Sequence, residues 1–168
     1  MKASIKIEIR DIILQLQTYT YYTGEARKNA GLPARLASDI QASDNEVAQL
    51  YDHLNVAFDE IAALISRYLS FCNTKGIENP DAPHSNIICY SFHLPHNYPI
   101  ECVEQIKRAA IGYAVKRAAQ QWFTQCKPDE AMNINSELQS QLIHLREILT
   151  MRKQPFINER QGKKQIDI

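Results

Sequence analysis

The sequence predicts a mainly α-helical protein: a bundle of about four helices with one short β-strand or hairpin and an extended C-terminal arm. Apolar residues recur at helical spacing over several long stretches. Only 5 glycines and 7 prolines are present, too few for the many turns of an all-β chain. Hydrophobic residues make up 45% and charged residues 23%, the balance of one globular domain with its own core. We therefore expect a helical domain at residues 1–151 and a charged, flexible arm at 152–168.

The first helix is predicted for about residues 7–23. Residues 5–9 alternate between apolar and charged side chains, as a strand would, but from Asp11 onward the apolar positions fit a helix face. Gly24 is suited to end this helix. Residues 24–43 then predict a loop with a short helical turn, and a connection of this length is often functional or mobile.

Three tyrosines lie close together in this first helix. Tyr19 and Tyr22 fit its core face, whereas Tyr21 is predicted to point elsewhere. Because tyrosine is enriched at protein interfaces, an exposed Tyr21 is a weak sign of an interaction surface.

The clearest helix is predicted for residues 44–70. Ser43 and Glu46 have the spacing of a capping box at its start. Apolar residues then recur at i, i+3, i+4 and i+7 over about seven turns. Residues 70–86 are rich in Asn, Gly and Pro, which predicts a loop.

A β-strand is predicted for residues 88–94, because apolar side chains alternate there with small or polar ones. Pro95 ends it. A single strand is not stable alone, so this one needs a partner. The partner is either residues 5–9 of the same chain or a strand of another subunit.

Two further helices complete the predicted bundle. Asn97 and Pro99 are placed to cap and begin the third, whose apolar stripe is rich in alanine and permits close approach of another helix. The pair at 127–128, Lys-Pro, ends it, and Asp129 is placed to cap the fourth helix. Helical spacing is lost at Arg152, where the predicted arm begins.

Charge and hydropathy exclude several classes of function. Lys and Arg total 19 and so do Asp and Glu, so the chain lacks the basic excess of a free-standing nucleic-acid binder. It contains no run of about 18 apolar residues that could span a bilayer. The N-terminus carries charges where a signal peptide would carry its apolar segment. We therefore expect a cytoplasmic protein without a membrane partner, and we disfavour nucleic acid as a partner.

No catalytic motif is recognisable, so we predict that the protein is not an enzyme. A glycine-rich phosphate loop is missing, and no local signature joins a nucleophile to a base. The best candidate metal site is the group Cys89, His93, His96 and Cys102, which are zinc-ligand residue types. Their spacing matches no standard zinc finger, and Cys89 and His93 share one face of the predicted strand. We therefore expect no metal or cofactor, and free thiols at the cysteines.

Basic residues of the third helix define an alternative function, that of a helical regulatory or nucleic-acid-associated module. They make part of this helix basic. The ordinary explanation of such charges is a solvated helix face. The residues that would contact nucleic acid in the alternative function are Lys107, Arg108, Lys116 and Arg117.

Three features favour a protein that assembles with copies of itself: a strand without an evident partner, a long loop and a charged arm. Subunits of rings and tubes use such parts to reach their neighbours, by strand addition or by ordering an arm. The residues expected at the contacts are Tyr90 and Phe92 in the strand and Arg152, Lys153 and Arg160 in the arm.

The order of elements agrees with this interpretation. An amphipathic N-terminal helix and a polar loop precede a long helix that ends in Ile65-Ser66-Arg67-Tyr68-Leu69. A short strand ending at a proline, a helix ending in Gln121-Trp122-Phe123 and a last helix running into Arg152-Lys153-Gln154-Pro155 follow. Over roughly residues 5–156, this arrangement resembles the head–tail connector (adaptor) proteins of tailed phages and prophages. The resemblance implies a ring-forming structural subunit of a virion, with copies of itself and neighbouring portal or tail proteins as partners and no catalytic residues.

Overall fold

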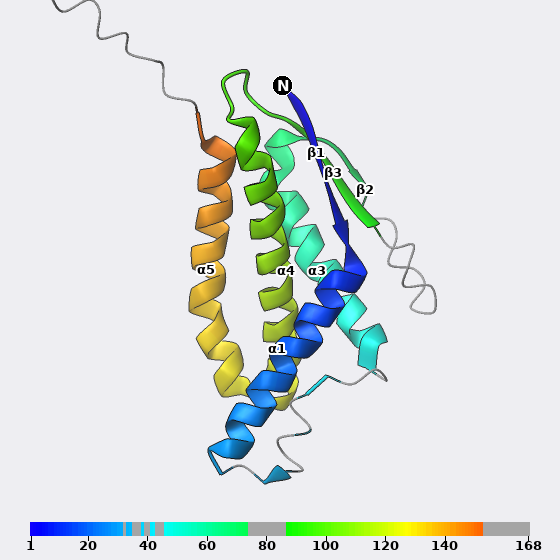
Figure 1. The fold of residues 1–168 in the computed structure, drawn as a ribbon, viewed down its shortest axis with the longest axis vertical. Coiled ribbons are helices and arrows are strands. Elements are labelled where there is room, and N and C mark those ends of the chain that lie inside the picture. The colour runs from blue at the N-terminus through cyan, green and yellow to red at the C-terminus, as the bar shows by residue number, and fades with distance from the viewer. Residues whose placement is uncertain (32, 35–37, 39–40, 43–45, 74–86, 153–168) are drawn as a thin grey trace, which may run out of the picture.

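The prediction of a mainly helical protein with four long helices is confirmed (Figure 1). The computed structural model describes residues 1–31, 33–34, 38, 41–42, 46–73 and 87–152. The predicted arm from residue 153 onward therefore lies outside the described residues. In chain order the elements are β1 (Lys2–Glu8), α1 (Ile9–Asn29), α3 (Val47–Ile65), β2 (Leu69–Asn73), β3 (Ile87–His93), α4 (Val103–Cys126) and α5 (Pro128–Thr150).

Helix α4 is the centre of the fold. It packs against α1, α3, α5 and β1, and in Figure 1 it lies between α5 and α3. The alanines Ala110, Ala114 and Ala118 are spaced four residues apart on one side of α4 and are fully buried. Their small side chains let a neighbouring helix approach closely, as the alanine-rich stripe predicted.

A three-stranded antiparallel sheet has the order β1-β3-β2. Ile5 of β1 pairs with Tyr90 of β3, and Ile7 pairs with Ile88, so the apolar side chains of both strands point to one buried face. One predicted partner of β3 was residues 5–9 of the same chain. The observed partner on that side, β1, covers most of this range. The alternative, a strand from another subunit, is wrong, because β3 is the central strand and both of its neighbours belong to this chain.

The expected contact residues Tyr90 and Phe92 are core residues, which corrects their assignment to an interface. Both are 0% exposed. Their rings lie 6.4 Å apart, and the Tyr90 hydroxyl donates a hydrogen bond to the Phe58 carbonyl oxygen of α3 at 3.2 Å. The apolar face of β3 therefore packs on helices of its own chain and is not available to a partner.

Helix α1 extends past the predicted end at Gly24, which is buried within the helix. The helix ends at Asn29, and Gly31 follows with a φ of +98°, a left-handed conformation that favours glycine. The Gly31 amide donates a hydrogen bond to the Lys28 carbonyl at 3.0 Å, which satisfies one of the last carbonyls of the helix. A glycine therefore does end this helix, but it is Gly31 and not Gly24.

The predicted boundaries of the later helices also need correction. Helix α3 ends at Ile65, because a short 3₁₀ turn leads into β2, and the backbone of β2 is paired in the sheet. The predicted loop at 70–86 therefore begins with a strand, and residues 74–86 lie outside the described part of the chain. Ser43 of the predicted capping box also lies outside it. Helix α5 begins one residue before Asp129, with Pro128 in its first turn.

Two substitutions in β3 test whether its apolar face is core. Phe92→Ala is expected to lower the free energy of unfolding by about 3–5 kcal/mol, because it leaves a cavity in a packed site. Tyr90→Phe removes only the hydroxyl bonded to Phe58 and is expected to lower it by about 1 kcal/mol. Urea unfolding followed by circular dichroism measures both. Near-neutral effects of both changes would mean that this face is exposed in the free subunit.

Candidate functional site

A groove runs between α3 and α5, with α4 at its floor. It consists of two adjoining hollows of about 510 and 440 Å³, and both are lined by Ala63, Leu64 and Arg146. The first is further lined by Glu60, Tyr113, Arg117, Asn135, Leu138, Gln139 and Leu142, and the second by Ser66, Arg67, Tyr68, Leu149 and Thr150. Because the two hollows share three lining residues, we describe them together as the α3–α5 groove.

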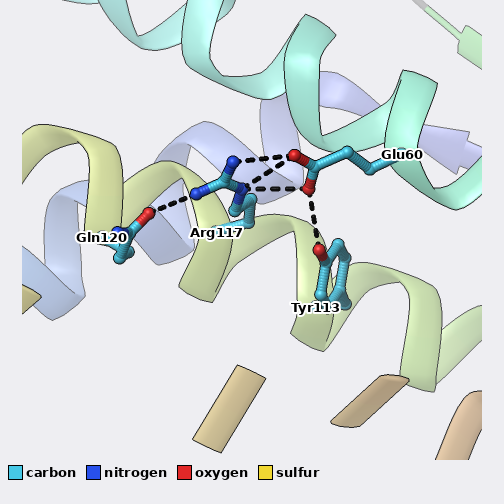
Figure 2. Close-up of polar contacts among 4 residues, drawn as sticks. All are labelled: Glu60, Tyr113, Arg117 and Gln120. Atoms are coloured by element: carbon cyan, nitrogen blue, oxygen red, sulfur yellow. Dashed lines mark hydrogen bonds and ion pairs between the residues drawn. The ribbon is translucent and has the colours of Figure 1, made fainter. Parts of the chain in front are cut away.

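A polar cluster at the floor of the groove joins α3 to α4 (Figure 2). The Arg117 guanidinium donates to both carboxylate oxygens of Glu60, with Nη2 to Oε1 at 2.7 Å and Nε to Oε2 at 2.9 Å. The buried Tyr113 hydroxyl donates to Oε2 at 2.7 Å, and Arg117 Nη1 donates to the side-chain oxygen of Gln120. A bidentate arginine–carboxylate pair has a fixed geometry, so the cluster sets how the two helices meet.

The cluster keeps both of its charged members ionised. Burial alone would raise the pKa of Glu60, but hydrogen bonds from Arg117 and Tyr113 and the charge of Arg117 outweigh burial and hold that pKa below its usual value. The hydrogen bond to Glu60 is the largest cause of the raised pKa of Arg117. The two charges neutralise each other and both carboxylate oxygens already accept hydrogen bonds, so the arrangement is suited to fixing helices and not to accepting a proton.

The other two arginines of the groove are available for contacts. Arg67 and Arg146 are exposed, and both line the hollow nearest the C-terminal ends of α3 and α5. Across the residues that the structure describes, neither arginine has an ion pair or a side-chain hydrogen bond. One end of the groove is therefore positively charged, whereas its middle is neutralised by the cluster.

The four basic residues of α4 do not form the predicted basic surface. Lys116 follows Lys107 by nine residues and Arg117 follows Arg108 by nine, and nine residues correspond to about two and a half turns. The members of each pair therefore point to opposite sides of α4. Lys116 and Arg117 also form ion pairs with glutamates of α5 and α3. The predicted nucleic-acid surface is thus not found as one patch.

The structure does not bring the candidate zinc ligands together. Cys89 and His93 lie on the side of β3 that faces away from the core, His96 follows β3, and Cys102 immediately precedes α4. In the described ranges, no three His, Cys, Asp or Glu side chains lie close enough to share a metal ion. All four cysteines are free thiols.

The first residue of the predicted arm is described, and the others are not. Arg152 is exposed and donates two hydrogen bonds of 2.7 Å from Nη1, to the carbonyl oxygens of Thr150 and Met151. A positive charge at the C-terminal end of α5 suits the helix dipole. Lys153 and Arg160 lie outside the described residues.

A second surface lies on α1, and sequence reasoning found only part of it. Leu14, Tyr21 and Tyr22 are 52%, 51% and 66% exposed, and with Thr18 they follow one side of the helix. We call these four residues the aromatic face. The Tyr21 and Tyr22 rings meet edge to face with centroids 5.7 Å apart. Tyr19 and Tyr22 were both expected in the core, so the exposure of Tyr22, and of Tyr19 at 36%, is a correction.

A hollow adjoins the aromatic face. It has a volume of about 590 Å³ and lies between Thr18, Tyr21 and Tyr22 on one side and Gln41 and Ala42 on the other. One edge of the aromatic face therefore borders a recess, whereas Leu14 lies outside it.

The aromatic face and the α3–α5 groove are formed by different elements of the chain. Arg27 of α1 forms an ion pair with Glu130, which identifies the side of α5 that faces α1. Gln139, in the groove, follows Glu130 by nine residues, or about two and a half turns. Each molecule therefore presents two different surfaces, one on α1 and one between α3 and α5.

Comparison with known proteins identifies no relative of this chain. No family model matches the sequence, and no curated protein or solved structure is significantly similar to it. Within the described part of the chain, no helix combines the length and apolar character needed to cross a membrane. The interpretation of the two surfaces therefore depends on their own geometry.

The polar cluster makes stability depend on pH in a defined direction. The pKa of Glu60 is lower in the folded protein than its value of about 4.3 in an unfolded chain, so its contribution is complete above that value and is lost as the pH falls through the lower, folded pKa. Arg117→Ala is expected to lower the free energy of unfolding by roughly 1–2 kcal/mol near pH 7 and by less near pH 3. Urea unfolding at several pH values measures this difference.

Gln120→Ala is the matched control, because it removes one hydrogen bond from Arg117 and leaves the ion pair with Glu60 intact. Its effect should be smaller and nearly independent of pH. An Arg117→Ala effect that does not change between pH 7 and pH 3 would contradict the role assigned to Glu60.

Proposed function

We propose that the protein is a structural assembly subunit of a phage or prophage particle, a head–tail connector or adaptor that joins copies of itself into a ring. The aromatic face is the observation that carries this proposal. Contiguous exposed apolar side chains in soluble proteins mark interaction sites, and tyrosine is enriched in such interfaces. The order of elements, which resembles that of connector proteins, supports a ring as the form of assembly.

The placement of the two surfaces supports the same proposal. Subunits of a ring meet head to tail, so each must present two different surfaces, one for each neighbour. The aromatic face on α1 and the groove between α3 and α5 are two such surfaces. An isologous dimer would instead use a single surface that is complementary to itself.

Helical surfaces, and not strand addition, are the proposed means of assembly. β3 is paired on both sides and cannot accept another strand. The edge strand β1 carries exposed Lys2 and Lys6, and β2 has a register shift between Leu69 and Phe71. Charged residues and irregular pairing at sheet edges discourage the addition of strands.

The C-terminal arm is proposed to contact neighbouring subunits. Its first residue, Arg152, is exposed and lies two residues after the end of α5. Lys153 and Arg160 give it basic groups that suit an acidic surface.

The solution mass as a function of protein concentration tests the proposed function. Light scattering is expected to show growth from the 19.3 kDa chain to one closed species with a fixed number of subunits. Tyr22→Asp should raise the concentration needed for assembly at least about tenfold, because it places a charge in an apolar contact.

Ile100→Asp is the matched control for this substitution, because Ile100 is also an apolar residue, is 51% exposed and lines neither surface. It should assemble like the unchanged protein. A protein that stays monomeric at every concentration would contradict the proposed function.

A further inference from the structure

We propose that the aromatic face of one copy docks in the α3–α5 groove of a second copy, so that the subunits join head to tail. This inference rests on the proposed function, because it assigns the contact between neighbours in that assembly. The mode of binding is that of an amphipathic helix in a groove formed by other helices.

The two surfaces match in length. The groove follows α5 from Asn135 to Thr150, a span of about 22 Å at 1.5 Å per residue. On α1, the side that carries the aromatic face runs from the exposed Asp11 to the half-buried Glu25, a similar span of about 21 Å. One helix can thus lie along the whole groove.

The two surfaces also match in apolar character. Ala63 on the rim of the groove is exposed, and Leu64 and Leu142 are only half-buried within the single chain. They remain in part accessible because α3 and α5 both pack on α4 and leave the space between them open. Leu14, Tyr21 and Tyr22 of a second copy would cover them and be removed from water at the same time.

The charges specify which way the docked helix lies. Arg67 and Arg146 lie at one end of the groove, and neither has an ion pair among the described residues. Asp11 is an exposed carboxylate three residues before Leu14 on the same side of α1. With Asp11 at the arginines, α1 of the second copy runs antiparallel to α5 of the first.

The opposite end of the docked helix fits without a further ion pair. Glu25 already interacts with Gln41, at 3.4 Å, and with Lys28, at 3.7 Å, within its own chain. The groove presents only the neutral amides of Asn135 and Gln139 at that end. An arrangement of the opposite polarity would bring Glu25 to the arginines but would leave Asp11 beside these amides.

A charge exchange tests the assigned polarity. Asp11→Arg and Arg146→Asp are each expected to raise the concentration at half-assembly at least about tenfold, because each places like charges together. Both changes in one chain should recover part of the lost assembly, because the ion pair is re-formed in reverse while Arg67 still lies at the same end of the groove. Failure of the double variant to recover while both single variants are impaired would overturn the pairing of these two residues.

Mixing two defective variants tests the head-to-tail arrangement. The first carries Tyr21→Asp and Tyr22→Asp, which removes the aromatic face and keeps the groove. The second carries Ala63→Trp, which fills the groove and keeps the face; because all three positions are exposed, both variants should fold, and circular dichroism checks this. Each should be monomeric alone, and an equimolar mixture should form 1:1 dimers of about 39 kDa, twice the mass of one chain.

Each other outcome excludes part of the inference. If the unchanged protein assembles and the mixture stays monomeric, the contact is not head to tail. If only Ala63→Trp prevents assembly, the groove binds another segment, such as the arm. If neither variant affects assembly, the contact lies elsewhere: this inference is overturned, and the aromatic face no longer supports the proposed function, although the assembly itself still does. If the unchanged protein never assembles, the proposed function itself is wrong.

Discussion

The burial of α4 on three sides is the constraint on which the rest of the structure depends. α1, α3, α5 and the sheet all pack on this one helix, and its buried alanines let the neighbours come close. These elements leave part of α4 uncovered between α3 and α5. The Glu60–Arg117 pair spans part of this uncovered region, where it fixes the distance between α3 and α4. The open groove is thus a direct consequence of how the core is built.

Local patterns in the sequence predicted the helices well and the sheet only in part. Four helices follow from the spacing of apolar residues, which depends on neighbours within each helix. The strand character of residues 69–73 depends on pairing with β3, some 20 residues further on, and a local pattern carries no sign of that partner. The buried state of Tyr90 and Phe92 was missed for a related reason, because one apolar strand face looks the same whether its own helices or another subunit covers it.

The candidate surfaces were harder to predict than the fold. The sequence does not indicate that Arg117 has an ion-pair partner, because Glu60 lies 57 residues away. Only the packing of α3 on α4 brings the two side chains together. The aromatic face was hidden because apolar residues of α1 occur around most of its circumference: Ile12, Ile13 and Leu16 are buried, whereas Leu14 is exposed. A helix of this kind does not reveal which side faces the core until its neighbours are known.

The pairing of β1 with β3 also determines the order in which the chain can fold during synthesis. β1 is made first, but its partner lies roughly 80 to 90 residues later in the chain. At about 5–20 residues per second, translation leaves β1 and the start of α1 without the sheet for roughly 4–18 seconds. The apolar residues Ile5 and Ile7, fully covered in the finished protein, face water or a chaperone throughout that interval. Rapid synthesis of the segment between the two strands would therefore favour correct folding over aggregation of nascent chains.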